Sequence, residues 1–321
     1  MHAIRLHTFG PAENLTHEHV DAPTPAPGQV RIAVAAAGVH LLDTALRRGE
    51  QGPLPELPAL PTIPGREVAG VVESLGEEVA ALWLGKRVVA HLGLAPGGYA
   101  ESAVVDVDRV HEIPKNLDFA QAVAMIGTGR TAMGIVQFSE LGPDSTVIVP
   151  AAAGGLGTLL VQYAKHAGAT VMGLAGGPEK TAIARANGAD LAVDYTTPEW
   201  PEKVRAWLDG RHATTVFDGV GGTVARKATA LLGPTGRHIV FGWSSGEPYA
   251  LEGVSVQVLG PAMMRKAGGP SPVRTLELRA LTEAAEARLV PAIQRFPLSA
   301  AAKAHQALET RQTTGKVVLE P

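Results

Sequence analysis

The chain has 321 residues, of which 45% are hydrophobic and 18% charged, with a formal net charge of −3. This length predicts two domains of ordinary size. The charge excludes a strong general attraction to nucleic acid or anionic membranes, because such partners are bound through clustered lysine and arginine. No apolar stretch approaches the roughly 20 residues of a membrane span, and the first residues do not resemble a secretory leader, so we expect a cytoplasmic protein.

Residues 1 to about 120 contain short apolar stretches separated by glycine and proline, which is typical of a barrel-like β module. In the second stretch Val30, Ile32 and Val34 alternate with other residues, so they are expected on one face. The proline-rich stretch Gln51–Gly65 predicts a loop over a site or an interface, because each proline removes a backbone donor and fixes φ. The predicted strands are residues 3–9, 30–36, 68–76, 87–91 and 99–105.

After about residue 120, apolar stretches alternate with helical segments, which predicts a parallel, doubly wound sheet. Gly168 follows the first helix, where a left-handed C-cap is expected. The apolar stripe of that helix consists of Leu156, Leu159, Leu160, Tyr163, Ala164 and Ala167. The predicted strands are residues 146–151, 170–175, 191–195, 214–220, 238–242 and 254–260.

The C-terminal segment predicts a helix at 275–287, a short strand at 289–293, a helix from Ser299 and a strand at 316–320. These elements are too few to form a domain by themselves. We therefore expect them to fold back onto the N-terminal β module. The predicted fold class is α/β, with a β domain of residues 1–120 and 262–321 and an inserted Rossmann-type domain of residues 121–261.

The glycine-rich turn Ala151–Gly157 lies between a predicted strand and a predicted helix. Free amides and the positive end of the helix dipole suit a diphosphate there, and small residues allow it to come close. This context favours a dinucleotide-binding turn. The alternative is a tight strand-to-helix turn without a ligand.

The end of the second strand of this αβ region favours NADPH over NAD. It reads Leu174–Gly177 and carries no acid for the adenosine ribose diol, which NAD sites commonly have. Lys180 follows, and with the amides of Gly176 and Gly177 it suits a ribose 2′-phosphate. Taken alone, Lys180 is better explained as a solvated charge on the helix surface.

Six stretches carry a family resemblance: residues 36–49, 63–76, 97–101, 151–157, 241–246 and 315–321. In this order they resemble the zeta-crystallin and quinone oxidoreductase branch of the medium-chain dehydrogenase/reductase superfamily, nearly end to end. The resemblance implies a GroES-like β-barrel catalytic domain with an inserted Rossmann domain, NADPH as cofactor, and commonly a homodimer formed through edge strands of the nucleotide domains.

By position, the resemblance also implies the cofactor contacts. For Tyr195 and Phe241 the alternative is plain packing of an aromatic ring on the sheet. The implied contacts are Thr131, Gly154, Gly155, Leu156, Gly157, Gly176, Lys180, Tyr195, Phe241 and Gly242.

No metal is expected. The chain has no cysteine, and Arg66 occupies the position of a ligand histidine in zinc-dependent relatives. A guanidinium there would repel a dication. His40, Asp43 and Glu67 would form a metal cluster only if all three side chains converged, because a zinc site needs at least three converging neutral or anionic ligands. We do not expect this arrangement.

Without a metal, the protein must supply hydrogen-bond donors to the oxygen on which charge develops. His40 stands where the family usually has Asn, and it either contacts substrate or cofactor and supplies a proton, or only fills space. Asp43 matches the family's acid and is expected to orient its neighbours or to cap a turn. Ala45 replaces a frequent tyrosine, which puts the quinone substrate in doubt. Trp243, where relatives often have Asn, either stacks on a flat substrate or packs at an edge.

Three functions remain open at this point. The first is an NADPH-dependent oxidoreductase that reduces a quinone or an α,β-unsaturated carbonyl without zinc, with His40 and Asp43 assisting. The second is an NADPH-binding sensor or structural protein with little catalysis. The third is a zinc-free ketone or alcohol oxidoreductase.

Overall fold

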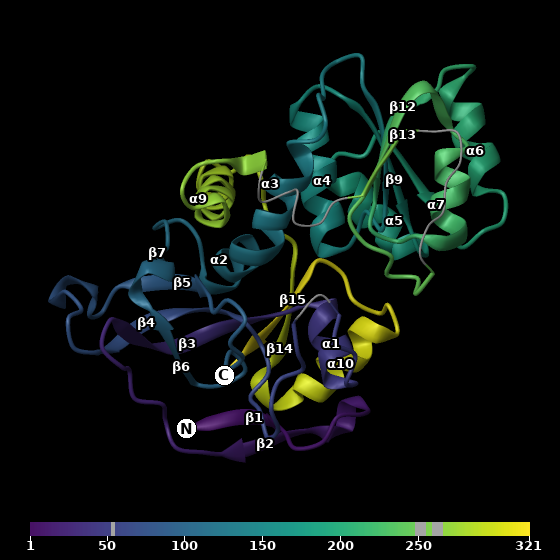
Figure 1. Ribbon diagram of the computed structural model, residues 1–321. Helices are drawn as coiled ribbons and strands as arrows, with labels where there is room; N and C mark the ends of the chain where they lie inside the picture. The colour runs from purple at the N-terminus through teal and green to yellow at the C-terminus, as the bar shows by residue number, and fades with distance from the viewer. Residues whose placement is uncertain (53–54, 248–254, 259–265) are drawn as a thin grey trace. The chain divides into compact units, whose positions relative to one another are not determined.

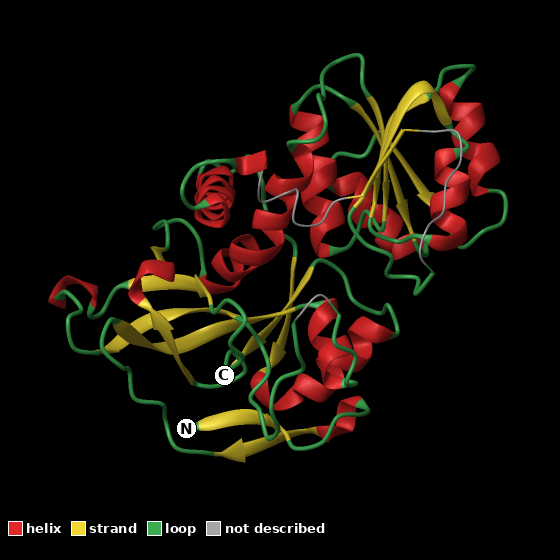
Figure 2. Cartoon of the chain, viewed as in Figure 1, coloured by secondary structure: helices red, strands yellow, loops and turns green. Residues whose placement is uncertain are grey.

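The computed structural model describes residues 1–52, 55–247, 255–258 and 266–321, and Figure 1 and Figure 2 show its elements. The chain divides into two compact units, unit 1 of residues 1–128 with 292–321 and unit 2 of residues 129–291. Unit 2 is therefore an insertion in unit 1, as the sequence predicts. Within the described ranges, no helix is long and apolar enough to cross a membrane.

The two ends of unit 2 differ from the predicted domain boundaries. The first lies at 128/129 rather than 120/121, and the second at 291/292 rather than 261/262. The predicted second boundary itself lies outside the described residues. Helix α9 (Pro272–Ala285) belongs to unit 2 because it packs against α3 (Arg130–Val136), where Arg130 forms an ion pair with Glu277 at 3.0 Å.

Unit 1 contains a seven-stranded sheet in the order β14-β15-β3-β4-β5-β7, with β6 also paired to β3. The long strand β3 forms its centre, and its alternating Val30, Ile32 and Val34 are all buried, as predicted. A separate hairpin joins β1 (His2–Leu6) to β2 (Leu15–His19). The sheet strands are β3 (Gln29–Val39), β4 (Glu67–Leu75), β5 (Arg87–His91), β6 (Ser102–Asp106), β7 (Val110–Glu112), β14 (Ile293–Pro297) and β15 (Lys316–Glu320).

The helices of unit 1 are short: α1 (Leu41–Arg47), α2 (Phe119–Ala124) and α10 (Ala301–Glu309). The C-terminal strand β15 returns to lie antiparallel to β3, with Val317 opposite Val39. This return brings residues near 316 beside residues near 39, so both ends of the chain contribute to one core.

Unit 2 contains a six-stranded parallel sheet in the order β10-β9-β8-β11-β12-β13. This is the doubly wound order of dinucleotide-binding domains, whose ligands lie beyond the carboxyl ends of the strands where the order reverses. The predicted α/β class and the Rossmann-type sheet are confirmed. The strands are β8 (Thr146–Pro150), β9 (Thr170–Ala175), β10 (Leu191–Asp194), β11 (Ala213–Asp218), β12 (Leu232–Val240) and β13 (Ser255–Val258).

The helices of unit 2 bury apolar stripes against this sheet. In α4 (Gly155–His166) the predicted stripe holds in part: Leu159, Leu160 and Ala164 are buried, whereas Leu156, Tyr163 and Ala167 are only partly buried. Gly168 beyond the helix has a positive φ of 85°. The other sheet-flanking helices are α5 (Pro178–Ala186), α6 (Trp200–Leu208) and α7 (Gly222–Thr229).

Several predicted strands have other bounds in the structure, such as 238–242, where β12 spans Leu232–Val240 and Phe241 and Gly242 follow it. The strand predicted at 289–293 lies instead at Ile293–Pro297, because Pro291 has no amide to donate to a ladder. Of the strand predicted at 254–260, residues 255–258 form β13, and the remainder lies outside the described residues.

Candidate active site

His40 lies at the junction between β3 and α1, where the chain leaves the sheet and turns into a helix. Its backbone amide donates to the Oδ2 atom of Asp43 at 2.8 Å. The side chain of His40 keeps 30% of its surface exposed. The short helix thus fixes the backbone of His40 and leaves its ring accessible.

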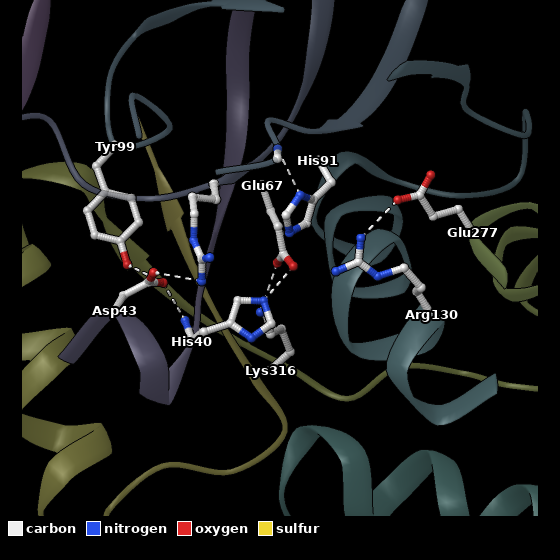
Figure 3. A network of polar contacts seen from close by, with 10 residues as sticks. His40, Asp43, Glu67, His91, Tyr99, Arg130, Glu277 and Lys316 are labelled. Atoms are coloured by element: carbon white, nitrogen blue, oxygen red, sulfur yellow. Dashed lines mark hydrogen bonds and ion pairs between the residues drawn. The ribbon is translucent and has the colours of Figure 1, made fainter. Parts of the chain in front are cut away.

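A buried carboxylate holds the ring of His40. Glu67, the first residue of β4, is fully buried, and its Oε1 atom lies 2.5 Å from Nε2 of His40. Its Oε2 atom accepts from Nζ of Lys316 at 3.0 Å, and Lys316 is the first residue of β15. Figure 3 shows the three side chains converging. One carboxylate therefore links β4, β15 and the junction between β3 and α1.

Two glycines make room for the carboxylate of Glu67. A Cβ atom added at Gly38 would overlap its Oε2, and one added at Gly127 would overlap its Oε1. Gly127 lies in a π-helical turn, Met125–Gly129, between α2 and α3. Such turns are rare and occur frequently at functional sites.

The surroundings keep Glu67 ionised. Burial by itself raises the pKa of this carboxyl, but the positive charges of His40, Lys316 and His91 and the hydrogen bond from His40 outweigh it and hold the pKa well below 4.5. His91 lies opposite Glu67 in the register of β4 and β5. Unit 1 therefore presents an imidazole backed by a negative charge.

A second chain of hydrogen bonds leads from Asp43 into the core. The hydroxyl of Tyr99 donates to Oδ2 of Asp43 at 3.1 Å, and Nε2 of His305 lies 3.1 Å from the same hydroxyl oxygen. Because this hydroxyl donates to Asp43, Nε2 of His305 is the donor to Tyr99. Burial and the charge of Asp43 raise the pKa of Tyr99 well above 10.0, so the phenol stays protonated and Asp43 is held as an acceptor.

Burial lowers the pKa of His305 from 6.5 to about 4. An unfolded chain takes up this proton near pH 6.5, so the proton favours unfolding between the two values. We expect the free energy of unfolding to fall by about 3 kcal/mol from this group as the pH is lowered from about 6.5 to 4. Urea unfolding of His305→Gln across this range should show a shallower pH dependence than the wild type.

Exposed His166 supplies the control for that measurement. His166→Gln should keep the wild-type slope, because the His166 ring lies on the surface and forms no part of the buried hydrogen-bond chain of His305. Equal slopes for wild type and His305→Gln would contradict a buried, neutral His305.

Arg66 and Asp43 border a pocket of about 400 Å³ within unit 1. Its walls come from α1 and from the described part of the proline-rich loop, including Leu57 and Pro58. The described part of Gln51–Gly65 contains no helix or strand of its own, as predicted, and its role in bordering a pocket agrees with a loop over a site.

In unit 2 the predicted cofactor residues lie mainly at the carboxyl ends of the parallel strands. The turn after β8 carries Gly154, Gly155, Leu156 and Gly157 into the start of α4. Gly176 follows β9 and Tyr195 follows β10, where a Cβ atom added at Gly176 would lie 3.8 Å from the Tyr195 hydroxyl. Phe241 and Gly242 follow β12, Lys180 lies in the first turn of α5, and Thr131 lies in α3.

These strand ends offer free amides and open space. No side chain caps the first turn of α4 or of α5 among the described residues, so their amides remain available. A Cβ atom added at Gly177 would meet nothing within 4 Å. These features fit a dinucleotide, whose diphosphate needs close approach to backbone amides.

Sequence reasoning missed one acid in unit 2 and the whole supporting network in unit 1. Asp194 ends β10, and hydrogen bonds from the amide of Gly177 and from Thr196 hold its pKa below the ordinary value. In unit 1 the missed residues are Lys316, Tyr99 and His305. The only available signals were a charged residue inside the apolar closing stretch Gly315–Pro321 and an aromatic ring in Gly97–Glu101.

Two family models match the chain, "Alcohol dehydrogenase GroES-like domain" over residues 26–115 and "Zinc-binding dehydrogenase" over residues 155–264. A quinone oxidoreductase of Pseudomonas aeruginosa is 32% identical and covers 99% of both chains. The chain belongs to the quinone oxidoreductase branch of the medium-chain dehydrogenase/reductase superfamily.

Other members of the branch show the same full-length agreement. A 2-haloacrylate reductase of a Burkholderia species is 32% identical over 99% of this chain and 98% of its own. The structure of Escherichia coli quinone oxidoreductase complexed with NADPH is 27% identical, has a TM-score of 0.87, and covers 100% of both chains. The predicted family is confirmed.

The side chains of His40, Asp43 and Glu67 do not form a metal-binding cluster in the described structure. Among the described residues, no group of three or more His, Asp or Glu side chains is arranged to hold a metal ion. Of the three acids and imidazoles considered from the sequence, His40 and Glu67 pair with one another, and Asp43 bonds to backbone and to Tyr99.

Proposed function

We propose that this quinone oxidoreductase-type protein is an NADPH-dependent enzyme that reduces a quinone or an α,β-unsaturated carbonyl without zinc. The observation that carries the proposal is the uncapped start of α4 after the glycine-rich turn, at the carboxyl edge of the six-stranded sheet. The full-length similarity to the E. coli enzyme complexed with NADPH supports it.

Unit 2 holds the cofactor in this proposal. The amides at the start of α4 bind the diphosphate, and Lys180 with the amides near Gly176 binds the 2′-phosphate. No acid occupies the end of β9, where an NAD site would place one for the ribose diol. The proposed contacts are Thr131, Gly154, Gly155, Leu156, Gly157, Gly176, Lys180, Tyr195, Phe241 and Gly242.

Unit 1 supplies the polar groups of the reaction. NADPH provides the hydride, and the reduced product also needs one proton. His40 is the proposed donor of that proton, because its ring is accessible and its other side is held by Glu67. Asp43 is a positioning residue, because it fixes the backbone amide of His40.

The test mixes the purified protein with NADPH or NADH and follows the loss of nicotinamide absorbance with quinones and enones, with EDTA present. We expect NADPH to be favoured by about 10- to 100-fold in kcat/KM, the size of one or two charge-assisted hydrogen bonds. EDTA should leave the rate unchanged. Loss of activity with EDTA would contradict the zinc-free mechanism.

The same assay separates the alternatives. Tight NADPH binding without turnover of any acceptor would indicate a sensor or structural protein. Oxidation of simple alcohols with NADP⁺ would indicate a ketone or alcohol oxidoreductase. The 2-haloacrylate reductase among the relatives favours conjugated acceptors over simple ketones.

The proposal includes a homodimer in the cytoplasm. Strands β10 and β13 are the two edge strands of the described sheet in unit 2, and an edge strand can pair with a second copy. A chain without cysteine gains nothing from an oxidising compartment. Light scattering that gives the mass of one chain would contradict the dimer.

A further inference from the structure

The pocket of unit 1 is apolar apart from a few charged side chains. Its described lining includes Leu6, Leu46, Leu57, Pro64 and Leu94. Its volume of about 400 Å³ suits a small organic molecule. An apolar pocket selects an apolar body, so the charged groups at its wall determine the polar end of its ligand.

Arg66 is one of two arginines of this pocket whose hydrogen bonds are incomplete in the described residues, the other being Arg47. The side chain of Arg66 is only 13% exposed, and its ion pair with Asp43 is long, at 3.8 Å from Nη2 to Oδ1. Its buried Nε atom has no hydrogen-bond partner within the described residues. A guanidinium offers five N–H donors and stays charged, so leaving it unbonded in an apolar wall is costly.

Asp43 is already committed elsewhere. Its Oδ2 atom accepts from the amide of His40 at 2.8 Å and from the hydroxyl of Tyr99 at 3.1 Å. Only Oδ1 faces Arg66, at a distance longer than a hydrogen bond. Asp43 therefore offsets the charge of Arg66 only in part.

The lining holds two arginines and two acids, which balance in formal charge but differ in exposure. Arg47 also borders the pocket and is buried, and its partner Glu309 is shared with Arg48. The remaining acid of the lining, Glu56, is exposed and therefore strongly screened by solvent. A negatively charged ligand gains from the two largely buried arginines, whose charges are less screened than that of Glu56, and a neutral ligand does not.

We propose that Arg66 binds a carboxylate, and that the pocket takes small, otherwise apolar carboxylic acids. This rests on the proposed function, since it assigns the class of acceptor as unsaturated acids. A planar carboxylate matches the guanidinium fork and satisfies the donors that Asp43 leaves free. In place of a metal, this branch member thus holds its acceptor through an arginine.

Calorimetry with benzoate and its neutral analogue benzamide tests the assignment without requiring turnover. The wild type should bind benzoate at least about 10-fold more tightly than benzamide, and Arg66→Gln should reduce that preference by about 10- to 100-fold. Lys86→Gln is the matched control, because Lys86 is an exposed cation of unit 1 outside the pocket. It should keep the wild-type preference.

Equal affinities for benzoate and benzamide in the wild type would overturn the proposal. An equal loss of affinity for both ligands in Arg66→Gln would also overturn it. If Arg66→Gln does not fold, Arg66→Lys replaces it, and full retention of the preference would contradict recognition by the fork of the guanidinium. Turnover of neutral quinones is measured separately. That activity can persist when benzoate is not preferred, so the failure of this inference is distinct from failure of the proposed function.

Discussion

Lys316→Met lowers the free energy of unfolding by about 3 to 5 kcal/mol, because it leaves the buried carboxylate of Glu67 without its lysine partner. The loss arises in the interior, where a charge cannot be rehydrated. Urea unfolding followed by circular dichroism measures it. The double variant Lys316→Met/Glu67→Leu should recover part of the loss, since it removes the stranded charge as well.

The matched control is the exposed ion pair between Lys86 and Glu112, at 3.1 Å. Lys86→Met should cost less than about 1 kcal/mol, because both partners stay in water. If Lys316→Met and Lys86→Met lower the free energy of unfolding equally, the buried pair does not stabilise the fold more than the exposed pair does.

The buried pair also sets a pH window. Because the pKa of Glu67 is held well below 4.5, its contribution to stability is fully present above about pH 4.5 and is lost as the pH falls toward the folded-state value. This window lies below the one expected from His305, so the two contributions can be told apart along one pH series.

Gly157→Ala is the second change with a large expected effect, and it acts on cofactor binding. A Cβ atom at this position would overlap the backbone carbonyl of Ala151, which forms the glycine-rich turn. A rigid backbone must then shift, at a cost of about 1 to 3 kcal/mol. We expect the Kd for NADPH to rise by about 5- to 150-fold, measured by fluorescence titration.

Gly142→Ala is the control for this substitution. A Cβ atom there would meet nothing within 4 Å, and Gly142 lacks a positive φ. Its Kd for NADPH should equal that of the wild type. An unchanged Kd in Gly157→Ala would mean that the turn does not hold the diphosphate.

Local patterns predicted much of the fold because they report local physics. The alternation of Val30, Ile32 and Val34 gave their common buried face, and the glycine after α4 gave its left-handed end. The glycine-rich turn was predictable because the strand, the turn and the helix follow one another directly in the chain. The motif around His40 and Asp43 was visible for the same reason.

Contacts between distant residues were not predictable. Glu67 and Lys316 are 249 residues apart, and Tyr99 and His305 are 206 residues apart. They meet because β15 returns beside β3 and because α10 belongs to the same unit. No spacing in the sequence encodes such a return, since side-chain periodicity identifies a buried face and does not identify its partner.

The C-terminal boundary of unit 2 was also not predictable from local sequence patterns. The sequence predicts a helix at 275–287 and groups it with the β domain, whereas this helix, α9, packs on α3 in unit 2. By itself the sequence determined the family, the two kinds of sheet and the cofactor turn, because each rests on residues close together in the chain. Only the tertiary structure decided which charges share the interior, because a buried ion pair or an incompletely bonded arginine depends on what long-range folding places beside it.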